Sequence, residues 1–97
     1  TGLNDPGEQP GSFTLEQNFP NPFNPLTTIT YTLLSASQVE LTLYNVLGQR
    51  MSRLVSAYQQ PGVYRHALDA TDLSSGTYLY ILKAGNRVET RKMLVLK

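Results

Sequence analysis

Three side chains that can move protons lie within seven residues of one another: His66, Asp69 and Asp72 in the stretch HALDATD. Catalysis by histidine requires a nucleophile and an orienting acid that converge on the ring, and His66 is the only histidine of the chain. The chain also has no cysteine, which removes thiolate nucleophiles, disulfides and thiolate metal sites. We therefore expect His66 to be a partly buried packing residue that shares a strand face with Tyr64 and Leu68.

The two aspartates could act as an acid and base pair or bind a hard cation. A carboxylate pair that cleaves glycosides must flank a cleft large enough for a sugar, and a 97-residue sandwich offers none. We expect Asp69 to end a strand, and Asp72 and Ser74 to bond nearby backbone N–H groups as turn residues. A structural Ca²⁺ at this turn, or at the turn carbonyls of residues 18–25, remains an alternative. We predict no catalytic residue, no metal site and no cofactor, and hence no enzyme.

The elements that carry these residues alternate apolar and polar side chains with a period of two. The segments of this kind are FTLEQ, TTITYTLL, QVELTLYNVLG, RMSRLVS, VYRHALDA, TYLYILKA and VETRKMLVLK. Alternation with β-branched and aromatic residues marks half-buried strands, and glycine, serine, asparagine and proline mark the turns between them. In 38–48, Val39, Leu41 and Leu43 should face inward, with Thr42 and Tyr44 outward. The pattern predicts an all-β, Ig-like antiparallel β-sandwich of about seven strands.

Composition limits the classes of partner. The net charge of +1 offers no footprint for nucleic acid or an anionic membrane, and no apolar run could form an integral membrane segment. Residues 1–12 are glycine, proline and polar residues, typical of a flexible linker and accessible to a protease. We expect residues 13–97 to form one domain, as the C-terminal part of a longer protein. Scattered Tyr44 and Tyr58, the latter expected in a loop, form no flat platform for sugars.

The stretch NFPNPFNP, residues 18–25, combines three prolines with three asparagines. Proline lacks an N–H donor and restricts the residue before it, and asparagine side chains bond the local backbone in turns. We expect a rigid crossing that leaves 13–17 on one sheet and delivers 27–34 to the other. Phe19 and Phe23 should fold onto an end of the sandwich.

Two features near the end of the chain stand out. Gly76 should need a positive φ, and Tyr78 should bury its ring and turn its hydroxyl back to the backbone, as in a tyrosine corner. In the closing hairpin, which turns at Gly85–Asn86, apolar residues occupy both faces. The outward stripe would consist of Leu79, Ile81, Leu94 and Leu96, rimmed by Lys83, Arg91, Lys92 and Lys97. Either another segment covers this stripe, or it binds a partner.

Four motifs, in order and spacing, resemble the type A C-terminal sorting domains of the type IX (Por) secretion system. They are the Pro20-Asn21-Pro22 entrance, YNVLGQ around Gly48, Leu73 with Gly76-Thr77-Tyr78, and the terminal strand with Lys92-Met93. The resemblance covers nearly all of 13–97, with one departure, because the family usually has an apolar residue where His66 stands.

The resemblance implies a non-catalytic module that sends a fused passenger protein across the outer membrane to the cell surface or medium, with the periplasm as the transit compartment. The implied partners are the outer-membrane translocon and a sortase-like protease, which would cleave in or near the linker before the passenger is attached to the surface. The candidate recognition residues are Leu79, Ile81, Lys92, Leu94, Leu96 and Lys97. The alternatives are an Ig-like spacer or adhesion module, and a carbohydrate-binding module of a secreted hydrolase.

Overall fold

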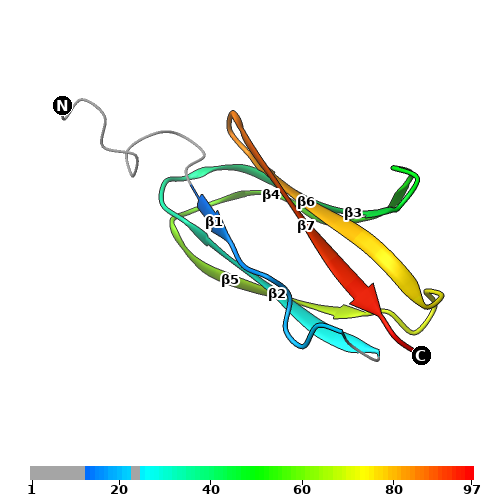
Figure 1. The fold of residues 1–97 in the computed structure, drawn as a ribbon. Helices are drawn as coiled ribbons and strands as arrows, with labels where there is room; N and C mark the ends of the chain where they lie inside the picture. Colours follow the sequence, from blue (N-terminus) through cyan, green and yellow to red (C-terminus); the bar gives the residue numbers. More distant parts are fainter. Residues whose placement is uncertain (1–12, 23–24) are drawn as a thin grey trace.

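The computed structural model describes residues 13–22 and 25–97, which form seven strands in two antiparallel sheets (Figure 1). The three-stranded sheet contains β1 (Phe13–Leu15), β2 (Leu26–Leu33) and β5 (Gly62–Asp69) in the order β1-β2-β5. The four-stranded sheet contains β4 (Arg50–Gln59), β3 (Ser37–Asn45), β6 (Gly76–Ala84) and β7 (Arg87–Val95) in the order β4-β3-β6-β7. The predicted all-β sandwich of about seven strands is confirmed. The predicted linker, residues 1–12, lies outside the described residues.

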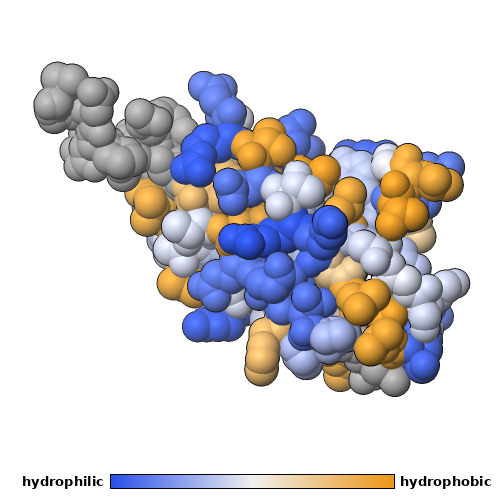
Figure 2. All heavy atoms as spheres, viewed as in Figure 1, coloured by the Kyte–Doolittle hydropathy of each residue, from blue (hydrophilic) through white to orange (hydrophobic). Residues whose placement is uncertain are grey.

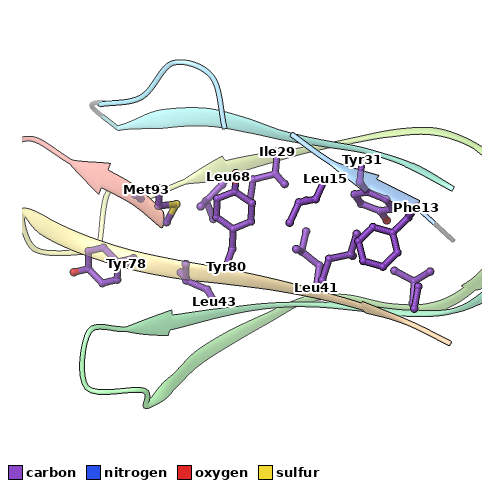
Figure 3. Close-up of a cluster of buried hydrophobic side chains, with 14 of the residues drawn as sticks. Phe13, Leu15, Ile29, Tyr31, Leu41, Leu43, Leu68, Tyr78, Tyr80 and Met93 are labelled. Carbon is purple, nitrogen blue, oxygen red and sulfur yellow. The ribbon is translucent and has the colours of Figure 1, made fainter. Parts of the chain in front are cut away.

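The core lies between the two sheets and follows the alternation of the sequence. Figure 3 shows side chains of both sheets pointing into this layer. Val39, Leu41 and Leu43 of β3 are buried, as predicted, and Tyr80 of β6 is fully buried. The buried apolar residues are Phe13, Leu15, Ile29, Tyr31, Leu33, Val39, Leu41, Leu43, Leu68, Ala70, Tyr78, Tyr80, Leu82, Ala84, Met93 and Val95.

The proline- and asparagine-rich stretch does not cross between the sheets, so that prediction is wrong. β1 and β2 are neighbours in the same sheet, with Phe13 opposite Leu33 and Leu15 opposite Tyr31. Backbone hydrogen bonds in both directions between Phe19 and Thr28, each 3.0 Å, prolong this pairing beyond β1. The stretch is therefore a wide turn between two paired strands. The Phe19-Pro20 and Asn21-Pro22 peptide bonds are both cis.

The prediction that Phe19 packs onto the end of the sandwich is also wrong, because 80% of its surface is exposed. The inward place belongs instead to Asn18, which is only 2% exposed. Its Nδ2 donates to the Pro20 carbonyl at 3.1 Å and to Thr27 Oγ1 at 2.9 Å. The Asn18 side chain thus makes hydrogen bonds inside a turn whose prolines have no N–H group to donate. Phe23 lies outside the described residues.

The last strand, β7, forms the edge of the four-stranded sheet, and the first residues of the domain cover that edge. Gln17 Nε2 donates to the Lys92 carbonyl at 2.5 Å, and the Leu94 N–H donates to Asn21 Oδ1 at 2.9 Å. Arg91 donates from Nε and Nη2 to the Leu15 carbonyl at 3.1 and 2.9 Å. Side chains thus occupy backbone groups that an unprotected edge would offer to another chain.

The two ends of the sandwich differ in what they present. At one end the Arg87 guanidinium lies 5.0 Å from the centre of the Phe13 ring, so the start of β1 lies beside the β6–β7 turn. At the other end lie the β3–β4 turn and the C-terminus, where Lys97 N–H donates to Ser75 Oγ at 2.9 Å. Nine residues of β6 separate the ends, about 30 Å at the rise of a strand. Figure 1 shows the same separation, with the C-terminus far from β1.

Candidate interaction surface

The outer face of the four-stranded sheet carries the apolar stripe predicted for the closing hairpin. Residues opposite one another in an antiparallel pair point to the same face, so the register orders this surface into rows. One row runs from Arg50 through Tyr44 and Leu79 to Lys92, and the next runs from Arg53 through Thr42 and Ile81 to Thr90. Because Tyr78, Tyr80, Leu82, Met93 and Val95 are buried on the inner face, the predicted faces of β6 and β7 are confirmed.

Exposure along this stripe is graded. Leu79, Ile81 and Leu94 are half-buried by their neighbours in the sheet, whereas Leu96 is 49% exposed. Thr42 faces outward, as predicted, yet it is only 6% exposed, because it lies between the Arg53 and Ile81 positions on two flanking strands. The apolar stripe therefore adjoins Thr42 of the central strand β3, which its neighbours shield from solvent.

The cations predicted to rim the stripe divide into two groups. Lys83 and Lys92 stand on the outer face and are exposed. Arg91 is not part of the rim, because its guanidinium bonds the Leu15 carbonyl beside the first strand. Lys97 bonds through Nζ to the Thr71 carbonyl, which holds the end of the chain against the β5–β6 loop. The structure thus places Lys92 and the leucines on one face, with Lys97 at its end.

The β3–β4 turn extends the same end of the domain with two exposed aliphatic side chains. Val46 is 64% exposed and Leu47 is 79% exposed. Figure 2 shows hydrophobic atoms gathered at this turn, at the upper right of the view. Gly48 was predicted to mark this turn, whereas the exposure of Val46 and Leu47 beside it was not predicted. The signal was available, since VL in a hairpin turn departs from the polar composition usual for turns.

The residues of the β5–β6 loop have structural partners. Asp69 ends β5 as predicted, and its Oδ1 accepts hydrogen bonds from the backbone N–H and hydroxyl of Thr71, which lower the pKa of the Asp69 carboxyl. The structure therefore gives Asp69 the turn role that we expected of Asp72 and Ser74. Among the described residues, no three His, Asp or Glu side chains gather as metal ligands.

His66 is half-buried on the inner face of β5, between half-buried Tyr64 and buried Leu68. Its partial burial lowers the pKa of the imidazole. The ring of Tyr64 stacks on that of Tyr31 with 5.4 Å between centroids. The predicted packing role of His66 is consistent with this position.

Gly76 and Tyr78 have the geometry expected of a tyrosine corner. Gly76 has a φ of +151°, and the hydroxyl of Tyr78 donates to the Ser74 carbonyl at 2.9 Å. A Cβ added to Gly76 would meet no atom within 4 Å, so the requirement for glycine is set by the backbone and not by crowding. The positive φ of Gly76 and the buried, hydrogen-bonded ring of Tyr78 support the prediction that both residues stabilise the fold.

A hydroxyl that the sequence analysis did not consider ties the entrance turn to the core. Tyr80 Oη donates to the Glu16 carbonyl at 2.7 Å and accepts from the Asn18 N–H at 2.7 Å. Burial raises the pKa of Tyr80 to about 12. The contact spans residues more than sixty positions apart, and alternation predicts only that this side chain points inward.

A shallow depression of about 260 Å³ is lined by Gln38, Glu40, Lys83 and Gly85. It has no aromatic ring on which a sugar could stack. Tyr58, predicted to lie in a loop, belongs to β4 and is 63% exposed.

In the described part of the chain, no helix is long and apolar enough to cross a membrane.

Comparison with known proteins bears on this surface. Residues 17–96 match the family model Por_Secre_tail, described as a secretion system C-terminal sorting domain. The match includes the entrance turn, the β3–β4 turn, the tyrosine corner and the whole outer stripe. The search of curated proteins found no match.

Proposed function

The chain belongs to the family of secretion system C-terminal sorting domains, and from this premise we propose that it directs a fused passenger protein across the outer membrane through the type IX secretion system. Its sorting role implies export to the cell surface or the extracellular space. We propose that the route passes through the periplasm and that the domain itself is not catalytic. The sorting signal is then a surface of the folded domain, which a partner must recognise by contact.

The observation that carries the recognition proposal is the outer stripe of the closing hairpin. Leu79, Ile81 and Leu94 form a half-buried apolar face that ends in the more exposed Leu96. Lys92, on the same face, supplies charge at its border, and Lys97 supplies charge at the end of the chain. An apolar centre with a polar, solvent-accessible rim is the usual anatomy of a protein-binding surface. We propose the outer-membrane translocon as the partner of this stripe.

Cleavage and attachment complete the proposal. A sortase-like protease would cut in or near residues 1–12, which are rich in glycine, proline and polar residues. The passenger would then be joined to the cell surface or released.

A reporter fusion tests this function. The reporter is followed by the 97-residue chain and expressed in a bacterium that has the secretion system. The test variant carries Leu94→Thr and Leu96→Thr, which keep strand propensity on an outer face. Val88→Thr is the matched control, because Val88 is 57% exposed on the outer face of the same strand at its other end. We expect the reporter in the medium or on the surface with the parent and the control, and in the cell with the double variant.

Folding is measured separately, by circular dichroism of the purified domains. If the parent fusion is exported no better than the reporter alone, the sorting function is refuted. If the double variant unfolds, the two leucines belong to the core and not to a binding surface. Normal export of a folded double variant would remove the stripe from the recognition site and leave the sorting function standing.

A further inference from the structure

The β3–β4 tip, defined as Val46 and Leu47, is exposed far beyond what the fold requires. Neither residue belongs to the core, and 64% and 79% of their surfaces are accessible. A hairpin of this length can close on polar residues alone, which would avoid leaving two aliphatic side chains in water. The described part of the fold gives these two adjacent side chains no packing partner, which leaves them available for binding.

The backbone beneath the tip is fixed by one asparagine. Asn45 Oδ1 accepts from the N–H of Leu47 at 2.9 Å and from that of Gln49 at 3.0 Å. The Asn45 carbonyl accepts from the Gly48 N–H at 3.0 Å, and Asn45 Nδ2 donates to Gln49 Oε1 at 2.7 Å. Gly48 has a φ of +81°, which a residue with a side chain rarely adopts. The two aliphatic side chains are thus held outward, so a partner need not order the loop on binding.

The charges around the tip indicate what kind of partner it fits. Arg50 and Arg53 follow the tip on β4, and Lys92 lies on the same face of β7, two strands from β3. The nearest acidic residue on β3 is Glu40, about 16 Å before Asn45 along the strand. Among the described residues the one ion pair joins Arg87 to Glu89, at the other end of β7. On the β3–β4 hairpin itself, the charged side chains nearest the tip are therefore cations.

These features favour a protein pocket over the other possible occupants. A second copy of the domain would bring like charges together around the tip, which opposes association. Membrane-inserting loops favour tryptophan and other aromatic residues at the interface, and the tip has none. A pocket with an apolar floor and a rim of carboxylates matches both the side chains and the charges.

We propose that the β3–β4 tip inserts into such a pocket on a protein of the export machinery, as a second contact beside the outer stripe. The proposal rests on the sorting function and adds an anchor to it. Tyr44 connects the two surfaces, since it immediately precedes Asn45 and lies opposite Leu79. The partner would hold the tip in its pocket and cover the stripe with an adjoining surface.

The test uses the same reporter fusion with the double variant V46S/L47S. Leu34→Ser is the matched control, because Leu34 is a 46% exposed aliphatic residue that follows β2 at the opposite end of β3. The double variant V46I/L47M keeps the tip apolar. We expect V46S/L47S to fold with an unchanged melting temperature and to lower export about tenfold or more. The control and V46I/L47M should be exported like the parent.

Each contrary result has a separate meaning. Parental export by a folded V46S/L47S overturns the tip proposal and leaves the sorting function intact, whereas failure of the parent fusion overturns both. Unfolding of V46S/L47S would show that the tip packs in the core and overturn the proposal. The tip proposal is also overturned if the parent, but not V46S/L47S, sediments as a dimer or floats with phosphatidylglycerol vesicles. A dimer would show that the tip binds a second copy of the domain, and flotation would show that the tip binds a lipid surface.

Discussion

Tyr80→Phe removes one oxygen atom from the centre of the domain and tests whether that hydroxyl holds the entrance turn in place. The ring stays, so the packing of this fully buried side chain is preserved. The Asn18 N–H loses its acceptor in a residue that is 2% exposed, and such an unsatisfied donor costs about 1–3 kcal/mol. The Glu16 carbonyl also loses a donor, but Glu16 is exposed and water can replace the hydroxyl.

With a loss of about 2 kcal/mol, the melting temperature should fall by about 8–16 °C for a domain of this size. Tyr64→Phe is the matched control, because the Tyr64 hydroxyl donates to the Gln60 carbonyl at 2.7 Å in an exposed position. Its removal should cost about 0.5 kcal/mol or less. Circular dichroism gives both melting temperatures, and hydrogen exchange of the Asn18 amide reports the entrance turn directly. Equal melting temperatures for the two variants, with an Asn18 amide as protected as in the parent, would refute the reasoning.

Three further results are expected. The folded-state pKa of Tyr80 is about 12 against an ordinary 10.0, so the free energy of unfolding should fall by about 2–3 kcal/mol as the pH rises between these values. Urea titrations at pH 9 and 11.5 should show this fall, and the fall should be smaller in Tyr80→Phe. Gly76→Ala should destabilise the domain by about 1–3 kcal/mol, since φ is +151°, and thermal melts at parental stability would contradict this. A chelator should leave the melting temperature unchanged; a fall would reveal a structural cation.

The strands and core could be predicted because alternation is a local property. Val39, Leu41 and Leu43 repeat every second residue, and so do Tyr78, Tyr80 and Leu82, which fixes the buried face of each strand. The pairing partner of a strand is not local. Nothing in NFPNPFNP distinguishes a crossing between sheets from a wide turn within one sheet, and the structure shows the turn.

The candidate surface could be predicted only in part, because alternation gives the face on which a side chain lies but not its distant contacts. The stripe on β6 and β7 follows from alternation, which also places Arg91 opposite inward-facing Tyr80 and so outside the rim; the contact of its guanidinium with the carbonyl of Leu15, 76 positions away, does not follow from it. The hydrogen bonds from Asn18 to Tyr80 and from Leu94 to Asn21 also join distant residues, which are 62 and 73 positions apart. Thr42 is shielded by flanking strands whose order the sequence does not state. The alternation pattern therefore could not predict side-chain contacts between distant segments.

The placement of Phe13 and Lys97 at opposite ends of the sandwich has a consequence for the order of events in export. The cargo precedes Phe13, whereas the β3–β4 turn and the C-terminus face away from it across about 30 Å. Under the proposed docking, the contact surface of the tip therefore lies away from the attachment point of the cargo. In the proposed function, the bond that a protease would cut lies before Phe13, at the end of the sandwich opposite the proposed docking tip, so cleavage would not require release of the docked domain.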